Sequence, residues 1–409
     1  MKEKLTSLEK KWIMYDVGNS AFILLATTVI PIVFKALAKG KLSDSTYLAY
    51  WGYAVSISTI IVALLGPSLG SIADRRKKKK AIFSVFVFLG LLGCFLLPFS
   101  KSWLLFLGLY VLAKVGFNGS LVFYDSMLTD ITSEDRMDKV SSLGYAWGYI
   151  GSCIPFVISI AALSLFPKFG LKLSYAIVFS FLLTGIWWLI FTMPLFKSYE
   201  QKYFEESVHI NVFKNLKSTI KEILLNKQIL YFLISFFFYI DGVYTIINMA
   251  TAYGSSLGLS SNGLMIALLV TQLVAFPCAI FFGRISKRKK TSSLLKICIL
   301  AYTLIALYAI QLDKLYEFWV LAVGVGMFQG AIQALSRSYY AKIIPKEKSG
   351  EYFGIMDIFG KGASVIGTLL VSLISHLTGD QNKGIFAIAA LFIFGYISFC
   401  YAAKENKEI

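Results

Sequence analysis

Long apolar runs separated by short polar segments dominate the chain. A helix needs about 20 predominantly apolar residues to cross roughly 30 Å of hydrocarbon, and twelve runs meet that requirement, so each predicts a transmembrane helix. The expected spans are Ile13–Phe34, Tyr47–Ile72, Ala81–Phe99, Trp103–Met127, Val140–Phe166, Leu173–Phe196, Gln228–Ala250, Ser260–Phe282, Ser293–Ile310, Tyr316–Ile343, Tyr352–Leu377 and Ile385–Ala402.

The composition agrees with a membrane protein. Of the 409 residues, 57% are hydrophobic and 15% are charged, which is too apolar for a soluble multidomain chain. All five cysteines fall inside apolar runs, so the sequence contains neither a disulfide framework nor a CxxC metal site. The predicted fold class is therefore an all-α polytopic membrane protein, and no cofactor or metal is expected.

The distribution of Lys and Arg orients the predicted helices. The two tails and the loops after even-numbered spans carry 29 of these residues, whereas the loops after odd-numbered spans carry eight. Positively charged short loops stay on the cytoplasmic side, so we expect both termini in the cytoplasm. The net charge of +17 then needs anionic lipid headgroups as partner and no nucleic acid. The charged start of the chain has no small-residue cleavage site and reads as a cytoplasmic tail.

The two halves of the chain carry a weak repeat. Matched positions are Gly70 with Gly283, Asn118 with Gln329, and Gly144 with Gly354, at offsets of 213, 211 and 210 residues. Glycine and basic loops are common in membrane proteins and could coincide, but the near-constant offset favours an internal repeat, which is typical of transporters. We expect two six-helix bundles, at residues 1–196 and 228–409.

The predicted cytoplasmic linker, residues 197–227, is amphipathic. Its apolar residues at helical spacing are Val208, Phe213, Leu216, Ile220, Ile223 and Leu224, and Lys214, Lys217 and Lys221 lie between them. A helix lying on the inner leaflet shows this pattern. A helix that binds a partner protein is the alternative.

Two sets of motifs resemble a known family. The segment GSIADRRKKK from Gly70 to Lys79 resembles the loop that follows the second span in the major facilitator superfamily, with Lys77 in place of the second glycine. The resemblance implies the twelve-helix major facilitator fold. It also implies that Gly70 allows close helix approach and that Asp74 and Arg75 make charge contacts that stabilise one conformation.

A closer resemblance covers most of the chain. Its motifs are WIMYDVGNSAF from Trp12 to Phe22, YIDGVYTI from Tyr239 to Ile246, and ALSRSYYAKIIPKEKSGEYFG from Ala334 to Gly354. These are similar to the branch called the unknown major facilitator family and to the autophagy-related vacuolar amino-acid effluxers, although Val17 and Gly18 replace the usual Trp-Ala. The resemblance implies export of amino acids or similar small solutes.

Asp241 is the leading candidate for function. It stands about 20 Å along the seventh span at 1.5 Å per residue, where an ionisable group costs at least about 2.5–3.5 kcal/mol and needs a partner or a wet cavity. It is expected to bind a proton or substrate, and a fixed ion pair is the alternative. Lys114 lies at a similar depth in the fourth span, and the resemblance implies that the two face each other across the pathway. The alternatives are that Lys114 extends to the interface or contacts a neighbouring helix.

Further polar residues in the predicted spans are candidates for the substrate or proton pathway. Asp357 and Lys361 form an i,i+4 pair that can satisfy itself or contact substrate, and Arg337 suits an inner gate or a lipid phosphate. Asp16 is either a gating residue or a favourable charge at a helix start. The others are Asn19, Tyr244, Asn248, Gln272, Gln329 and Gln333, which either line the pathway or join helices by hydrogen bonds.

The sequence favours a secondary transporter over the other classes. No GxxxxGK[ST] loop is present for ATP-driven transport. Asp125 and Asp130 could bind a metal and a diphosphate in a membrane enzyme, but a spacing of five places them on different helix faces. A lipid or glycolipid flippase on the same fold is the main alternative, and a receptor is a remoter one. We therefore expect a monomeric, multi-pass protein of the cell membrane that moves a small-molecule substrate by alternating access with proton coupling.

Overall fold

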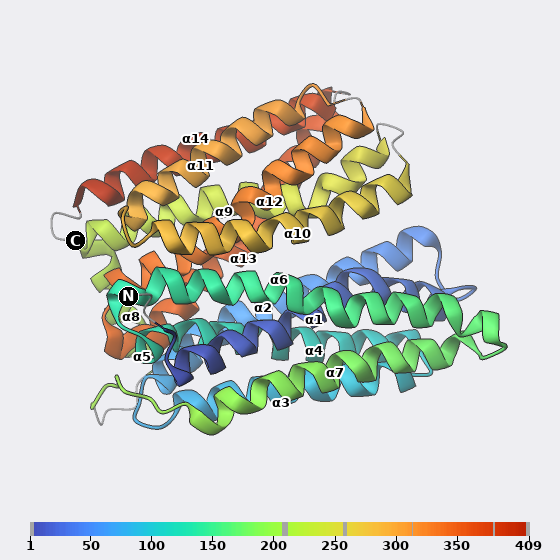
Figure 1. The fold of residues 1–409 in the computed structure, drawn as a ribbon, viewed down its shortest axis with the longest axis horizontal. Helices are drawn as coiled ribbons and strands as arrows, with labels where there is room; N and C mark the ends of the chain where they lie inside the picture. Colours follow the sequence, from blue (N-terminus) through green and yellow to red (C-terminus); the bar gives the residue numbers. More distant parts are fainter. Residues whose placement is uncertain (1–3, 207–211, 257–259, 313, 379–380, 406–409) are drawn as a thin grey trace. The chain divides into compact units, whose positions relative to one another are not determined.

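The computed structural model is mainly helical in the part of the chain that it describes, which is residues 4–206, 212–256, 260–312, 314–378 and 381–405. Its α-helices (Figure 1) are α1 (Ser7–Ala38), α2 (Asp44–Ala73), α3 (Lys79–Leu96), α4 (Trp103–Ser126), α5 (Leu128–Ile131), α6 (Glu134–Leu165), α7 (Leu173–Ser198), α8 (Val212–Leu225), α9 (Lys227–Ser256), α10 (Ser261–Ile285), α11 (Thr291–Ala309), α12 (Leu315–Ile343), α13 (Ser349–Thr378) and α14 (Gln381–Glu405). Short 3-10 turns lie at Leu97–Phe99, Pro167–Phe169 and Lys346–Lys348.

Twelve segments among the described residues are long and apolar enough to cross a membrane, and they coincide with the twelve predicted spans. Helices suit this setting because they satisfy their own backbone groups in lipid. The structural helices begin and end several residues away from the predicted bounds. One such difference is in α1, which begins at Ser7 because Thr6 and Glu9 form a reciprocal capping box.

The chain forms two compact units. The first contains residues 1–131, 147–212 and 346–354, and the second contains residues 132–146, 213–345 and 355–409. Helices α6 and α13 therefore each contribute their first turns to one unit and their remaining turns to the other. The predicted division at the 197–227 linker does not include this exchange and stays a proposal.

Small residues allow close helix packing inside the first unit. A Cβ atom on Gly116 of α4 would collide with the backbone of Gly90 on α3, so the two helices meet at their backbones. The core of this unit also contains stacked aromatic rings, with Trp12 and Tyr124 at 4.4 Å between centroids. In the second unit, Phe232 of α9 stacks on Tyr340 of α12 at 5.3 Å.

Helix α8 has the amphipathic character that the linker pattern predicts. Ile220 and Leu224 are 51% and 59% exposed, while Ile223, three residues after Ile220 on the same apolar stripe, is buried. Val208 lies outside the described residues. An exposed apolar face flanked by lysines is consistent with contact to the membrane surface.

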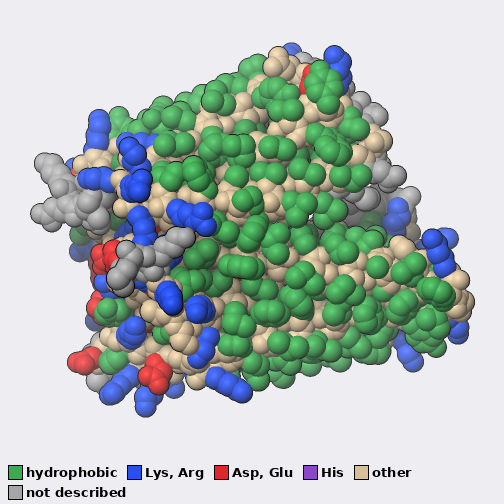
Figure 2. Space-filling model, in the orientation of Figure 1, with side chains coloured by type: hydrophobic (Ala, Val, Ile, Leu, Met, Phe, Trp, Pro, Cys, Tyr) green, Lys and Arg blue, Asp and Glu red, His purple; other side chains and the backbone are tan. Residues whose placement is uncertain are grey.

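The surface follows the membrane pattern that the sequence predicts. Figure 2 shows hydrophobic side chains over much of the visible face, with Lys and Arg side chains mainly toward the left and right ends of the view. That arrangement suits helices that cross hydrocarbon and end in a headgroup layer.

Candidate functional site

Asp241 is fully buried on α9, in the second unit. Its Oδ1 atom accepts hydrogen bonds from the backbone N–H of Gly367 at 2.9 Å and from the Thr245 hydroxyl at 3.3 Å. Its Oδ2 atom is buried without a hydrogen-bond partner, and no cation pairs with the carboxylate among the described residues. Half of this carboxylate is thus satisfied and the other half is available to a proton or a cationic group.

Glycine at position 367 makes this arrangement possible. A Cβ atom there would overlap both the Asp241 Oδ1 and Thr245 Oγ1 atoms. A larger residue at position 367 would therefore push the carboxylate away from the backbone N–H group that donates a hydrogen bond to it. The Asp241 site therefore requires glycine at position 367, where α13 packs against α9.

A cavity of about 280 Å³ lies in the second unit beside Asp241. Thr245, whose hydroxyl donates to Asp241, also lines the cavity, and Ser372 and Ser375 add two hydroxyl groups from α13. The remaining lining is apolar: Ile246, Met249, Ala250, Ile305, Ala306, Ala309, Phe318, Leu321, Val371, Ile385 and Ile388. The Thr245 hydroxyl thus lies between the buried Asp241 carboxylate and the cavity.

The candidates from the first unit have local partners. The Lys114 ammonium lies over the Phe117 ring, 5.5 Å from its centroid. Because Lys114 and Asp241 belong to different units, their expected pairing stays a prediction. Asp16 is buried and accepts a hydrogen bond from the Tyr124 hydroxyl at 2.8 Å, which joins α1 to α4. Asn19 is buried with its Nδ2 atom lacking a partner among the described residues.

The remaining candidates of the second unit fall into two groups. Lys361 donates to Asp357 at 2.6 Å, the self-pairing that the i,i+4 spacing predicts. Tyr244, Gln272 and Gln333 are half-buried on α9, α10 and α12, and Gln329 is buried on α12; the Asn248 side chain lies outside the described part of the structure. These positions leave the polar groups of both bundles as candidates without deciding among them.

A cluster that the sequence indicates only in part lies in the first unit. Asp74, at the end of α2, is fully buried and accepts hydrogen bonds from the backbone N–H groups of Gly350 and Glu351 at 2.7 and 2.8 Å. These are among the first N–H groups of α13, where a helix favours negative charge. Gly70 permits the approach, because its Cβ would collide with the Gly350 carbonyl.

The cation that reaches this acid is Lys79, which was not among the predicted gating residues. The Lys79 ammonium lies 3.6 Å from Asp74, 3.4 Å from Asp130 and 2.7 Å from the Ser349 hydroxyl. Arg75 makes no ion pair among the described residues, and its backbone instead bridges to Glu205. The first residue of α3 therefore supplies the charge that the motif assigns to the preceding turn.

Asp130 is a structural anchor in this region. It accepts hydrogen bonds from the Tyr199 hydroxyl at 2.6 Å and from the backbone N–H groups of Lys202 and Tyr203 at 3.1 and 3.0 Å, in addition to its contact with Lys79. Each carboxylate oxygen is occupied by protein donors. This arrangement fits packing of the chain after α7 and gives no support to the metal and diphosphate alternative.

Burial changes the electrostatics of Asp74. Desolvation raises the pKa of Asp74 to about 6, Lys79 and the two backbone donors oppose that rise, and Glu205 adds to it. The group therefore titrates close to the pH of a cell. Packing of α13 against α2 buries the Asp74 carboxylate, and burial disfavours its charged form. Ionisation of Asp74 and this helix packing are therefore coupled.

The second unit contains a corresponding cluster at the start of α6. Asp138 accepts hydrogen bonds from Thr291 at 2.6 Å, from Ser338 at 2.6 Å and from the Lys342 ammonium at 2.8 Å. Arg337 is buried beside it, donating to the Ser141 hydroxyl and carbonyl at 2.9 and 3.0 Å, with its guanidinium 4.5 Å from the Tyr145 ring centroid. Arg337 thus contacts α6 and not a central site.

The two clusters occupy repeat-related positions. Thr291 follows Lys79 by 212 residues, Lys342 follows Asp130 by 212, and Ser349 follows Asp138 by 211, which are the offsets of the internal repeat. We call Lys79, Asp130 and Ser349 the first end cluster, and Thr291, Lys342 and Asp138 the second end cluster. Each contains one lysine, one acid and one hydroxyl, but the three types are permuted among the positions. The two clusters therefore correspond in position along the repeat but not in residue type at each position.

Known proteins resemble this chain over nearly its whole length. A family profile described as "Vacuole effluxer Atg22 like" matches residues 7–408. The chain belongs to the Atg22-like family. The uncharacterized MFS-type transporter YxiO of Bacillus subtilis (strain 168) is 42% identical over 416 residues, covering 100% of this chain and 97% of that protein.

A fungal relative and a solved structure extend the comparison. Autophagy-related protein 22 of Vanderwaltozyma polyspora is 24% identical across 93% of this chain and 88% of its own length. The human organic anion transporter MFSD10 (TETRAN) superposes with a TM-score of 0.75 at 12% identity, covering 96% of this chain and 98% of that chain. This Atg22-like chain is thus a multi-pass membrane protein with the major facilitator fold. Its relatives and structural neighbours are transporters and not enzymes.

Proposed function

We propose that this Atg22-like transporter exports amino acids or similar small zwitterions across the cell membrane by alternating access, as a monomer with both termini in the cytoplasm and with protons as coupling ions. The observation that carries the proposal is Asp241, a buried intramembrane carboxylate with one oxygen held by Gly367 and Thr245 and the other without a partner. The "effluxer" description of the matching family profile supports export.

The chemistry of Asp241 suits coupling. An ionised carboxylate that lacks a cation is costly in the membrane interior, and a bound proton or the ammonium group of a substrate removes that cost. Because the two events neutralise the same oxygen, they compete. Release of a proton into the adjacent cavity would then accompany binding of a cationic group, which links the two movements.

The end clusters suit the gating part of the cycle. Each holds the first turns of a helix that continues into the other unit, α13 in the first case and α6 in the second. Asp74 adds two backbone hydrogen bonds to the start of α13. Separation of these contacts is the proposed opening of one end of the pathway, and their re-formation is its closing.

The first experiment is a binding screen followed by a transport assay. Purified wild type and Asp241→Asn are melted at pH 5.5 and 7.5 with amino acids, short peptides, sugars and lipids. A ligand at 100 times its Kd stabilises by about 2.7 kcal/mol. We expect an amino acid or short peptide to raise the melting temperature of the wild type, and not that of Asp241→Asn, and the same solute to drive proton movement in proteoliposomes.

The control is Glu200→Gln, an equally conservative change of an exposed carboxylate after α7, which should respond like wild type. A response of Asp241→Asn equal to wild type would remove Asp241 from the mechanism. Stabilisation by lipids and by no solute, lost in Asp241→Asn, would replace solute export with the flippase alternative.

A further inference from the structure

A groove of about 350 Å³ in the first unit lies apart from the candidate pathway residues. It is formed by one face of α1 and one face of α6, with α7 beneath them. On α1 the lining follows the i, i+3, i+4, i+7 pattern of a single helix face, from Lys10 through Ile13 and Met14 to Val17. On α6 it repeats that pattern from Trp147 to Ile154.

The groove is open near its α6 wall and closed by tight packing at its inner side. Trp147 and Ile154 are each 46% exposed, so apolar surface faces outward along the groove. Gly151 has no room for a side chain, because its Cβ would lie 2.5 Å from Val17 Cγ1. The Trp187 indole of α7 donates to the Val17 carbonyl at 3.0 Å and so presents its ring to the space.

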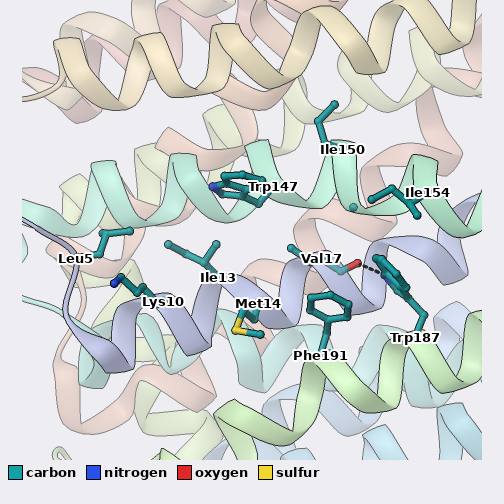
Figure 3. Close-up of a pocket in the computed structure, with 11 residues that line it drawn as sticks. Leu5, Lys10, Ile13, Met14, Val17, Trp147, Ile150, Ile154, Trp187 and Phe191 are labelled. Carbon is teal, nitrogen blue, oxygen red and sulfur yellow. Dashed lines mark hydrogen bonds between the residues drawn. The ribbon is translucent and has the colours of Figure 1, made fainter.

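One end of the groove is cationic. Figure 3 shows Lys10 at one end and Ile154 with Trp187 at the other. Lys10 is exposed, and its ammonium makes no hydrogen bond or ion pair among the described residues. The neighbouring Lys11 is directed elsewhere, donating to the Ser198 hydroxyl at 2.6 Å. No acidic residue lines the groove within the described part of the chain.

We propose that this groove binds one anionic phospholipid, with its phosphate at Lys10 and an acyl chain between α1 and α6. Lys10 lies two residues before Trp12, where the apolar run of α1 starts, so we place its ammonium at headgroup level and the rest of the groove in the hydrocarbon. Basic pockets between membrane helices at the positive side of a protein recognise anionic headgroups. A soluble zwitterion does not suit this groove, because its lining apart from Lys10 is apolar and offers little to its ammonium group.

The position of the site gives it a mechanical consequence. Trp147 is the residue at which α6 passes from the second unit to the first. A lipid that packs on Trp147 and Ile150 therefore contacts α6 where it changes unit. Occupancy should stabilise the packing of this part of α6 on α1 and α7.

The test is retention of lipid by the full-length protein in native mass spectrometry. Protein exchanged into equal phosphatidylglycerol and phosphatidylcholine should retain the anionic lipid about fivefold more, the factor that one basic residue near a charged headgroup typically contributes. Lys10→Glu should abolish that preference, and Lys11→Gln, the adjacent control, should keep it. Ile150→Trp, which fills the groove, should lower retention of phosphatidylglycerol with Lys10 intact.

Inorganic phosphate added in excess serves as the second arm. If phosphate displaces the lipid completely, a free anion site and not a lipid site is present, and the proposal fails. Equal retention of the two lipids by the wild type would also overturn it, as would an unchanged preference in Lys10→Glu. Because the variants leave Asp241 intact, these results are independent of the transport assay.

Discussion

Asp74 shows how one residue combines a motif with a distant contact. The motif after the second span predicts a functional acid there, and the structure places it against the first N–H groups of α13. Lys79 and Ser349 were not predicted, because Lys79 reaches Asp74 from the start of the next helix and Ser349 contacts Lys79 from a position far along the chain. Local patterns carry charge and periodicity, but they do not specify which surfaces meet.

Stability should depend on pH through Asp74. Its folded pKa of about 6 lies above the unfolded value of about 3.9, so its favourable contribution is present below pH 4 and lost as the pH rises through 6. Lys79, Glu205 and Glu351 face the carboxylate. We expect the wild type to lose up to about 2 kcal/mol between pH 4.5 and 7.5 from this group, at 1.36 kcal/mol per pKa unit.

The comparison protein for this prediction is Asp74→Asn, which keeps the shape but cannot ionise. Its thermal melting temperature should change less than that of wild type over the same pH series. Parallel pH dependences of the two proteins would show that Asp74 does not titrate in this range.

Lys77 carries backbone strain that a smaller residue would relieve. Its φ of +62° is in the left-handed region, which costs a side-chain-bearing residue about 1–2 kcal/mol, and it occupies the position of the motif's second glycine. The left-handed backbone conformation at this position is thus retained although lysine replaces glycine. Lys77→Gly should raise stability by about 1 kcal/mol after the larger unfolded-state entropy of glycine is subtracted, measured as a higher melting temperature.

The neighbouring Lys78 provides the matched control. Its φ of −93° is ordinary for any residue, so Lys78→Gly should be neutral or destabilising by up to about 1 kcal/mol. Equal losses in both variants would mean that the turn has no strain to relieve.

At the scale of helices, the hydrophobic pattern predicted all twelve spans, because hydrocarbon thickness sets the minimum length of each apolar run. It did not predict where helices begin. The polar start of α1 is helical because of the Thr6–Glu9 capping box, and α5 interrupts the end of the fourth span. Caps depend on a few polar residues that an average over apolar residues does not detect.

The start of α6 should be sensitive to loss of its acid. Asp138→Asn leaves the Lys342 ammonium, whose side chain is 12% exposed, without its charge partner, and breaking such a pair costs about 3 kcal/mol. Adding Lys342→Met should restore part of the loss, and a double-mutant cycle of melting curves measures the coupling. Lys348→Gln, which removes a pair with Glu205 that is 23% and 22% exposed, should cost less than about 1 kcal/mol. Additive losses at positions 138 and 342 would contradict the coupling.

At the scale of the whole molecule, the repeat offset predicted that the two halves correspond, and the end clusters carry that offset at three further positions. The exchange of helix starts between the units was not predicted. Apolar periodicity assigns a residue to a helix face but not to a bundle, so the transfer of residues 132–146 and 346–354 could be found only from tertiary packing.

The shared helices α6 and α13 bear on how such a gene can change. A recombination event in the linker would join a new second half to the old first half, and each unit would then contain a short segment inherited from a different parent. Compatibility would depend on two small seams, residues 132–146 and 346–354, more than on the linker itself. A lineage that exchanges halves must therefore change both short segments together, so the two halves of the gene are expected to evolve jointly.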